Sequence, residues 1–300
     1  MNNPVVSVCI TTFNKQDYIE QALDSILSQK TNFEIEVLIY DDASTDKTIQ
    51  IIKKHQENYQ NIHLFANSKN EYGNGILGIN ERHLFPKAKG KYIAMCDGDD
   101  YWSNETKLQL QVDFLEQNNQ YIMCCHDGDV YYQKSNTFGP IYPTPFQNPI
   151  TVAKIITMGG NLCPTSSIVF RNQFTEFPDF MMKSLSNDRA LTYFLMLQGK
   201  FWYINQKMCV YRVHSSGLIA AGDKTVRLKY LVSNIELTNN FAHFCSNNLP
   251  LQKLIYAERA NLAKNLFYFG NVKEFWHYKK YIRPLDWIKI LIFKLLNKNN

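Results

Sequence analysis

The chain has 300 residues, 45% of them hydrophobic and 20% charged, which excludes disordered and fibrous classes and allows one large domain with an appendage or two small domains. The formal net charge is +5, and residues 271–300, with seven Lys or Arg and two acidic residues, account for all of it. No apolar run reaches the roughly 18 residues of a membrane span and the start lacks signal-peptide order, so we expect a cytoplasmic protein.

The first hundred residues alternate between short apolar runs and segments with helical spacing. The apolar runs, predicted to be strands, are Val5–Thr11, Ile35–Tyr40, Asn61–Ala66 and Lys91–Cys96. The segments with helical spacing are Gln16–Gln29, Thr48–His55 and Ile76–Phe85. Near-continuous apolar strands that alternate with amphipathic helices indicate an α/β fold, with a mostly parallel, Rossmann-like sheet covered by helices on both faces.

The alternation weakens in the second part of the chain. The predicted helices there are Lys107–Gln117 and Asp188–Leu197, and residues 134–150 are a predicted loop. The predicted strands are Tyr121–Tyr132, Ser166–Phe170, 201–204 and 208–213. From about residue 223 the pattern is helical. We therefore expect a ligand-binding domain over residues 1–220 and a helical extension over residues 221–300.

The seven cysteines are scattered and include no CxxC pair. Most of them have strand-like apolar neighbours, where a cysteine is more often a buried free thiol than part of a disulfide framework or a zinc site. We expect seven free thiols, which agrees with a reducing compartment.

Three polar clusters follow predicted strands, at residues 11–14 (TTFN), 41–42 (DD) and 97–100 (DGDD). Ligands of parallel α/β sheets bind beyond the carboxyl ends of the strands, so these clusters are expected to meet in one cleft. The chain has no GxGxxG after its first strand and no GxxxxGK[ST], so neither a dinucleotide fold nor a P-loop is indicated. Phosphates would have to be neutralised by other means.

The DGDD turn places three carboxylates, Asp97, Asp99 and Asp100, directly after a buried strand. Like charges this close raise one another's pKa, and a divalent cation relieves the repulsion. Mg²⁺ or Mn²⁺ prefers carboxylate and phosphate oxygens, which favours a nucleotide diphosphate as its companion. The alternative is a solvated turn, because Asp and Gly are common turn residues.

Three segments in this order resemble the family 2 glycosyltransferases, the inverting GT-A enzymes of the bacterial cell-surface polysaccharide type. They are VSVCITTFNKQDYIEQALDSILSQ, IEVLIYDDASTDKT and GKYIAMCDGDDYW, and the resemblance spans roughly residues 5–215. It implies a GT-A fold and metal-dependent transfer of a hexosyl or N-acetylhexosaminyl group from a nucleotide-diphosphate sugar, usually UDP-linked. The acceptor would be a hydroxyl of a glycan or lipid-linked glycan.

The resemblance also implies roles for single residues. Asp42 would recognise the uracil edge, Asp97 would approach the ribose, and Phe13, often Tyr in relatives, would lie against the base without a hydroxyl contact. The full set implied for the nucleotide is Thr11, Phe13, Asn14, Asp42, Asp97 and Arg212, and the set implied for Mn²⁺ or Mg²⁺ is Asp99, Asp100 and His214. Arg212 and His214 lie in VYRVHSSG, where a structural role on a strand is the alternative reading.

The family places an acidic residue at the start of a later helix as the catalytic base. SLSNDRALTYFLMLQGK fits that context with Asp188 in the catalytic position, although Asn187 stands where Glu is usual. Such a base would take the proton of the acceptor hydroxyl as its oxygen attacks the anomeric carbon. The alternative role for Asp188 is a favourable interaction with the helix dipole.

The basic tail has two interpretations. Trp287–Leu296 (WIKILIFKLL) is too short to span a bilayer, but residues 283–298 suit an amphipathic helix that contacts anionic headgroups at the inner face of the cytoplasmic membrane. The other interpretation is a helix that packs on the domain or on a second subunit. The sequence therefore leaves open whether the protein forms an oligomer. No nucleic-acid-binding module is recognisable, so nucleic acid is not an expected partner.

Two other functions compete with the transferase. One is a non-catalytic nucleotide-sugar-binding protein, but the chain keeps every acidic position that the chemistry needs. The other is a nucleotidyltransferase, which normally has a Gly-rich basic loop after its first strand, and TTFNKQDY is not such a loop.

Overall fold

The computed structural model describes residues 3–142, 144–215, 217, 224–268 and 277. The apolar run at the N-terminus forms the central strand β1 (Val6–Thr12), because each of its side chains can be buried on one or the other face. Its parallel neighbours are β2 (Ile35–Asp41) and β4 (Tyr92–Asp97), and β3 (Ile62–Ala66) extends the parallel arrangement beyond β2.

The second half of the chain completes one nine-stranded sheet in the order β3-β2-β1-β4-β8-β6-β9-β5, with β7 paired to β6. The short strand β8 (Val169–Arg171) is antiparallel to both β4 and β6 (Tyr121–Tyr132), and β9 (Lys200–Val213) is parallel to β6. At the edges, β5 (Tyr101–Trp102) and β7 (Thr137–Pro140) pair antiparallel with β9 and β6. The prediction of a mostly parallel central sheet is confirmed.

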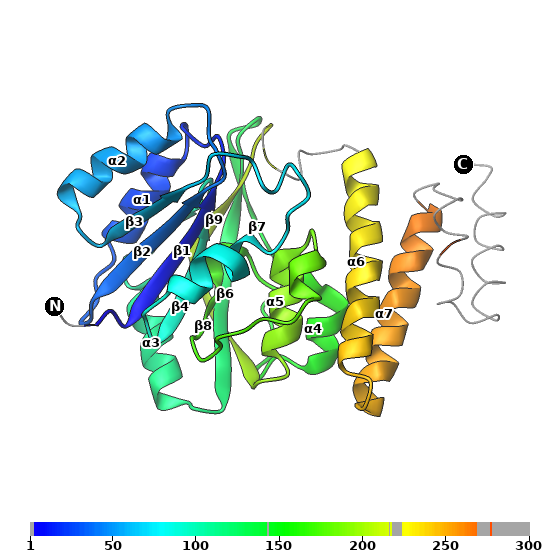
Figure 1. The fold of residues 1–300 in the computed structure, drawn as a ribbon. Coiled ribbons are helices and arrows are strands. Elements are labelled where there is room, and N and C mark those ends of the chain that lie inside the picture. Colours follow the sequence, from blue (N-terminus) through cyan, green and yellow to red (C-terminus); the bar gives the residue numbers. More distant parts are fainter. Residues whose placement is uncertain (1–2, 143, 216, 218–223, 269–276, 278–300) are drawn as a thin grey trace.

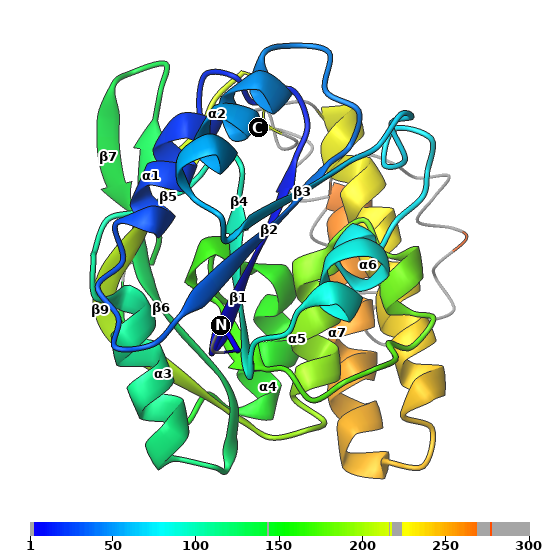
Figure 2. The same ribbon diagram turned by 60° about the vertical axis from the view of Figure 1, so that its left-hand side comes forward.

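Helices cover both faces of this sheet (Figures 1 and 2). Val8 of β1 faces a core that includes side chains of α1 (Ile19–Leu27), α2 (Thr48–Asn58) and α3 (Lys107–Gln117). The next residue, Cys9, faces a second core on the opposite side of the sheet. The period of two in a strand therefore sends successive apolar side chains into two different cores.

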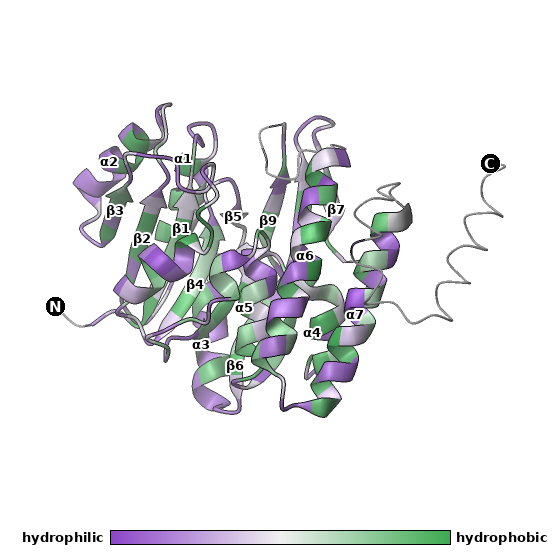
Figure 3. Cartoon of the chain, turned by 45° about the vertical axis from the view of Figure 1, so that its right-hand side comes forward, coloured by the Kyte–Doolittle hydropathy of each residue, from purple (hydrophilic) through white to green (hydrophobic). Residues whose placement is uncertain are grey.

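The second core contains side chains of α4 (Val152–Met158), α5 (Asn187–Leu195) and two long C-terminal helices. These are α6 (Lys224–Phe244) and α7 (Leu249–Tyr268), which lie side by side next to α4 and α5 (Figure 1). Both helices mix hydrophilic and hydrophobic residues along their length (Figure 3). They bury apolar side chains in the same core as the sheet: Leu237, Phe241, Leu251 and Ile255.

Residues 134–150, predicted as a loop, contain strand β7, and one predicted helix and two predicted strands also differ from the observed elements. The helix expected over Ile76–Phe85 is only a π-helical turn, η1 (Asn80–Leu84), followed by a 3₁₀ turn, η2 (Phe85–Lys87). Gly78 precedes it with φ of 72°, and Pro86 cannot donate a backbone hydrogen bond, so a regular helix is interrupted at both ends. The two strands expected within 201–213 form one continuous strand, β9, whose pairing with β6 shifts register near His126 and Asp127.

The seven cysteines are all buried and free, as the sequence predicted. The predicted amphipathic segment, residues 283–298, lies outside the described residues. Within the part of the chain that the structure describes, none of the helices has the length and hydropathy needed to cross a bilayer.

Candidate active site

A cavity of about 840 Å³ opens at the carboxyl ends of β1, β2 and β4. The three polar clusters of the sequence meet there, since Thr11, Asp42 and Asp97 all line it. The segment Ser184–Arg189, which leads into α5, forms another side, and residues of α6 and α7 complete the wall. The parallel topology brings these strand ends to one edge of the sheet, as expected from the position of the clusters.

Asp99 lies at the centre of a small charged cluster. Its Oδ2 is 2.6 Å from Lys15 Nζ and 3.0 Å from His214 Nε2, and the His214 ring packs on Tyr18 with centroids 4.4 Å apart. Burial opposes ionisation of Asp99, but the contacts with His214 and Lys15 outweigh it and hold the pKa of Asp99 below its usual range. Asp99 is therefore ionised at neutral pH.

Asp97 has the opposite electrostatic environment. Burial raises the pKa of Asp97 above its usual range, and the nearby carboxylates of Asp99 and Asp188 raise it further. Asp97, Asp99 and Asp188 thus share one cavity and repel one another there. A bound cation would relieve this repulsion.

Asp100 is turned away from the cavity, although it was expected among the metal ligands. It is 1% exposed, its Oδ1 accepts a hydrogen bond from Arg212 N at 3.0 Å, and its Oδ2 accepts one from Ser166 Oγ at 2.8 Å. Both oxygens face protein donors because the turn places Asp100 against β9. Its observed contacts are those of a residue that fixes the acidic turn.

Gly98 allows the acidic turn to approach β1 closely. A Cβ atom on Gly98 would lie 2.8 Å from Thr12 Oγ1, and Gly98 N donates to Thr11 O at 3.2 Å. Close backbone approach, rather than a left-handed conformation, is therefore what requires glycine in DGDD.

Arg212 contacts the acidic turn from β9. Its Nε donates to Asp99 O at 2.8 Å and its Nη2 donates to Gln21 Oε1 at 2.7 Å. The guanidinium lies over the rings of Tyr18 and Tyr101, with its carbon 4.9 and 5.2 Å from the ring centroids. Arg212 lines the cavity, so it can face a ligand while it holds the backbone of the turn.

The residues predicted to bind the nucleotide divide into two groups. Thr11, Phe13 and Asp42 line the cavity, and Phe13 offers an aromatic face that is 40% exposed. The Asp42 carboxylate accepts hydrogen bonds from Glu71 N at 2.7 Å and Tyr72 N at 2.9 Å, which fixes the loop after β3 over the cavity. A carboxylate has about four acceptor positions, so Asp42 keeps capacity for a ligand.

Asn14 belongs to the second group, because it is not among the residues that line the cavity. It has φ of 51°, its backbone N–H donates to Ser44 Oγ at 2.8 Å, and its Oδ1 accepts from Thr45 N at 2.8 Å. These contacts join the loop after β1 to the loop after β2. Asn14 thus supports the shape of the nucleotide side of the cavity from behind.

Asp188 lies in the first turn of α5 and lines the cavity. Its Oδ1 accepts a hydrogen bond from Arg189 N at 2.7 Å. Burial raises the pKa of Asp188, and the contact with the Arg189 backbone opposes that rise. A raised pKa makes a carboxylate a stronger base, as a role in proton abstraction requires.

Two further residues, Lys15 in the cavity and Glu81 behind Asn187, were not predicted from the sequence. Lys15 ends TTFNK and contacts Asp99, so a basic residue directly after β1 was the signal for it. Glu81 is 2% exposed and its Oε2 accepts from Asn187 Nδ2 at 2.8 Å, which places a carboxyl group beside the position where the family usually has Glu. Burial raises the pKa of Glu81 to about 7. Nothing in the local sequence around Glu81 indicates this contact.

The metal expected from the sequence can be tested against this donor set. Among the described residues no three His, Cys, Asp or Glu side chains are grouped so as to hold a metal by themselves. Mg²⁺ and Mn²⁺ are commonly held by one or two protein ligands and completed by phosphate oxygens. Asp99 and His214 offer a carboxylate and an imidazole within 3.0 Å of each other, beside the repelled carboxyl of Asp97, and this set fits such a site.

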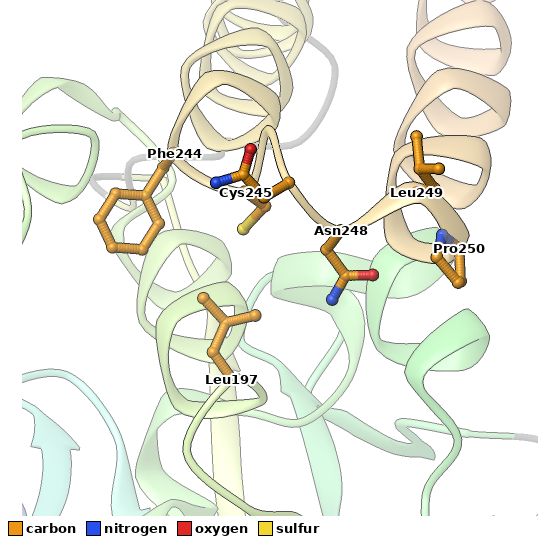
Figure 4. A pocket seen from close by; sticks show the side chains of 7 residues that line it. Leu197, Phe244, Cys245, Asn248, Leu249 and Pro250 are labelled. Atoms are coloured by element: carbon orange, nitrogen blue, oxygen red, sulfur yellow. The ribbon is translucent and has the colours of Figure 1, made fainter.

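A second cavity, of about 570 Å³, lies at the turn between α6 and α7 (Figure 4). Its lining includes Phe244, Cys245 and Leu249 and contains no acidic or basic side chain. It offers nothing that could neutralise a phosphate or move a proton. Of these two cavities, the larger one is lined by the charged side chains.

Comparison with protein families gives one match, in which residues 7–173 fit the model described as Glycosyl transferase family 2. An uncharacterized protein of Mycobacterium bovis is 30% identical over 213 residues, which are 71% of this chain and 60% of that protein. The chain therefore spans less than two thirds of the length of this relative. The UDP-Glc:alpha-D-GlcNAc-diphosphoundecaprenol beta-1,3-glucosyltransferase WfaP of Escherichia coli is 34% identical over 141 residues, 47% of this chain and 52% of its own.

Two solved structures share the fold. TarS of S. aureus in complex with UDP-GlcNAc has a TM-score of 0.62 and 17% identity, covering 88% of this chain and 73% of that chain. The mannosyltransferase PcManGT of Pyrobaculum calidifontis, in complex with GDP-Man and Mn²⁺, has a TM-score of 0.53 and 16% identity, covering 100% of this chain and 89% of that chain. These likenesses confirm the fold class expected from the sequence.

Proposed function

Because the chain belongs to glycosyl transferase family 2 and has the GT-A fold, we propose that it transfers a sugar from a nucleotide-diphosphate sugar to a hydroxyl group, with inversion. The observation that carries the proposal is the meeting of Asp97, Asp99 and Asp188 in one cavity. Two of these acids come from the turn after β4 and the third from α5, about 90 residues later in the chain. Folding does not require three acidic side chains to lie together. Binding of a donor diphosphate and transfer of its sugar with the help of a base both require acidic residues at this place.

The donor is proposed to lie between the strand ends and the loop after β3. Phe13 offers the base an aromatic face, Asp42 offers it a carboxylate oxygen, and Lys15 lies where the diphosphate would meet the acidic turn. We propose UDP as the nucleotide, supported by the family resemblance and by the fold shared with TarS, whose structure contains UDP-GlcNAc.

In the proposed reaction Asp188 takes the proton of the acceptor hydroxyl. The hydroxyl oxygen forms a bond to the anomeric carbon of the donor while the bond from that carbon to the diphosphate breaks on the opposite side, so the sugar is inverted. The diphosphate leaves with the electron pair, and Asp188 retains the proton. Lys15 supplies positive charge beside the leaving group, and burial keeps Asp188 basic.

Asp99 and His214 are the residues proposed to hold Mn²⁺ or Mg²⁺, with Asp97 beside them. A bound divalent cation would neutralise charge on the departing diphosphate. The fold shared with PcManGT, whose structure contains Mn²⁺, supports this proposal.

The proposed acceptor is a glycan or lipid-linked glycan, in line with the name of the E. coli relative, which acts on a diphosphoundecaprenol-linked sugar. The membrane contact predicted for residues 283–298 would suit such an acceptor and stays a prediction. The alternative interpretation, packing of that tail on protein, stays open beside it.

The proposal is tested by calorimetry with UDP, with and without Mn²⁺, followed by measurement of UDP release from a panel of nucleotide sugars. We expect UDP to bind more tightly with Mn²⁺ and at least one donor to be hydrolysed slowly in the absence of acceptor. In Asp188→Asn, UDP binding should persist while acceptor-dependent release falls roughly 10²- to 10⁴-fold.

The same experiment separates the competing functions. A non-catalytic binding protein would bind UDP and release it from no donor, with wild type and Asp188→Asn behaving alike. A nucleotidyltransferase would instead release pyrophosphate from a nucleoside triphosphate and a sugar phosphate, which is measured in parallel.

A further inference from the structure

One wall of the cavity is formed by α6 and α7, outside residues 7–173 that match the family model. Polar residues on these helices recur at spacings of three or four, so each helix turns one face to the cavity. These residues are Arg227, Tyr230 and Asn234 on α6, and Glu258, Asn261 and Asn265 on α7. The wall is thus a regular surface built by two neighbouring helices.

Both helices are attached to residues that flank the proposed base. Ser233 Oγ of α6 accepts a hydrogen bond from Leu185 N at 3.1 Å, three residues before Asp188. Glu258 of α7 forms a buried ion pair with Arg189, the residue after Asp188, with 3.2 Å between Oε1 and Nη1. The base must contact the attacking hydroxyl, so a wall fixed beside Asp188 borders the acceptor rather than the nucleotide.

The α6 face has a donor end and an acceptor end. Tyr230 Oη is 3.0 Å from Tyr72 Oη, and Tyr72 belongs to the loop that Asp42 holds over the nucleotide side. Asn234 is four residues further along α6, about 6 Å along the helix axis, and lies next to Ser233. The part of the wall beyond Tyr230 therefore faces away from the nucleotide.

The chemistry of this acceptor end is that of side-chain amides. Asn234 and Asn261 are uncharged, and Glu258, one helical turn before Asn261, is paired with Arg189. Asn234 Oδ1 is buried and has no hydrogen-bond partner among the described residues. An amide both donates and accepts hydrogen bonds, as a sugar hydroxyl does, and it offers no charge to an anionic group.

We propose that Asn234 and Asn261 form the acceptor subsite, and that this subsite takes the uncharged, hydroxyl-rich end of a saccharide. The inference rests on the proposed transferase function and specifies which class of acceptor the enzyme uses. Among the described residues, Arg189 beside these amides is already paired with Glu258, and Arg227 lies seven residues before Asn234, about 10 Å along α6 at the donor end. Desolvation of the charge of a uronate or a phosphorylated sugar would therefore oppose its binding at the amides.

The test uses the full chain, the donor that gives basal UDP release, and p-nitrophenyl glycosides as acceptors. The neutral set is the glucoside, galactoside and N-acetylglucosaminide, and the anionic set is the glucuronide and the glucoside 6-phosphate. We expect at least one neutral glycoside to accelerate UDP release and the anionic glycosides not to. Asn234→Ala and Asn261→Ala should each raise the KM of that glycoside roughly fivefold to tenfold.

Asn240→Ala is the matched control, because Asn240 lies on α6 but does not line the cavity, and its KM should equal that of wild type. Calorimetry with UDP shows that each variant is folded, and Asn234→Ser replaces the alanine variant if UDP binding is lost. The inference is wrong if only anionic glycosides, or no glycosides, accelerate UDP release. It is also wrong if the KM of the neutral glycoside is unchanged in both Asn234→Ala and Asn261→Ala. Basal UDP release would in these cases still support the transferase function. Absence of UDP release from every donor would instead overturn the transferase function itself.

Discussion

Lys15 lies in the site, although the sequence analysis did not predict it there. In the free protein its ammonium lies 2.6 Å from Asp99, and a diphosphate would give it a second anionic partner. Lys15→Met keeps the aliphatic stem and removes the charge. We expect the affinity for UDP to fall about tenfold while the affinity for uridine, which has no phosphate, changes little. Calorimetry with both ligands measures this difference.

Lys30→Met is the control, because Lys30 forms an exposed ion pair with Glu105 and does not line the cavity. Equal losses of UDP and uridine affinity in Lys15→Met would mean that Lys15 shapes the pocket and does not meet the phosphates.

Glu81 gives a prediction about stability and pH. Burial raises the pKa of Glu81 to about 7, above its value in the unfolded chain. A carboxyl group of this kind adds its full stability below the unfolded pKa and loses it as the pH rises through about 7. The loss should be on the order of 2 kcal/mol between pH 5.5 and 8, and Glu81→Gln, which does not ionise, should remove that dependence. Urea unfolding at pH 5.5, 6.5 and 8 measures it.

Glu57→Gln, at an exposed position of α2, serves as the comparison. If wild type and Glu81→Gln lose stability equally between pH 5.5 and 8, the burial of an ionisable Glu81 does not control this range.

At the scale of single elements, the loop after β3 depends on one carboxylate. Asp42 accepts hydrogen bonds from two backbone amides of this loop, Glu71 and Tyr72. Asp42→Ala removes both acceptors, so we expect faster proteolysis within residues 67–78 and roughly tenfold to hundredfold weaker UDP binding. Limited proteolysis with and without UDP measures the first effect, and calorimetry measures the second.

The adjacent acid provides a contrast. The Asp41 carboxylate accepts hydrogen bonds from Ser44 N and Ser44 Oγ, at 2.8 and 2.5 Å, and only the backbone carbonyl of Asp41, which Asp41→Asn keeps, accepts from the loop, from Asn67 N at 2.9 Å. Asp41→Asn should therefore leave the cleavage rate of residues 67–78 unchanged. Faster cleavage in both variants would assign the effect to the whole β2 turn and not to Asp42.

The elements that the sequence predicted well are those whose period is local. In β1, alternate side chains enter two cores, and α1 shows helical spacing, so a window of a few residues contains the signal. The position of Asp97 and Asp99 after β4 followed from the same logic. The turn at Asn80–Leu84 was mispredicted because its apolar residues have helical spacing while Gly78 and Pro86 break the backbone.

Other features depend on contacts between distant residues and could not be predicted locally. The inward direction of Asp100 is set by Ser166 and by the Arg212 backbone, which are 66 and 112 residues away. The contact of Asn187 with Glu81 crosses 106 residues. The resemblance to a family placed residues in the site, but the contacts that decide their roles come from the three-dimensional packing.

At the scale of the whole molecule, the boundary proposed near residue 220 divides the sequence but not the hydrophobic core. Phe241 of α6 and Ile255 of α7 lie in the same core as Met95 of β4 and Phe170 of β8. The buried ion pair between Arg189 and Glu258 adds a second connection. We therefore expect the helices and the sheet to unfold together, and circular dichroism and tryptophan fluorescence should give coincident urea transitions. Early loss of helical signal would instead indicate two separately folding units.

The ion pair between Arg189 and Glu258 allows the change in the free energy of unfolding to be predicted. Glu258→Gln would leave the Arg189 guanidinium buried without its charge partner, which costs about 3–5 kcal/mol when one member of a buried pair is removed. Because the two helices share the core of the sheet, both spectroscopic transitions should move to lower urea by the same amount. The double variant Arg189→Met with Glu258→Met removes both charges and should recover most of the loss. If Glu258→Gln moves only the helical transition, α7 is attached to the sheet too weakly to unfold with it, and the wall that it forms beside Asp188 would open independently of the donor site.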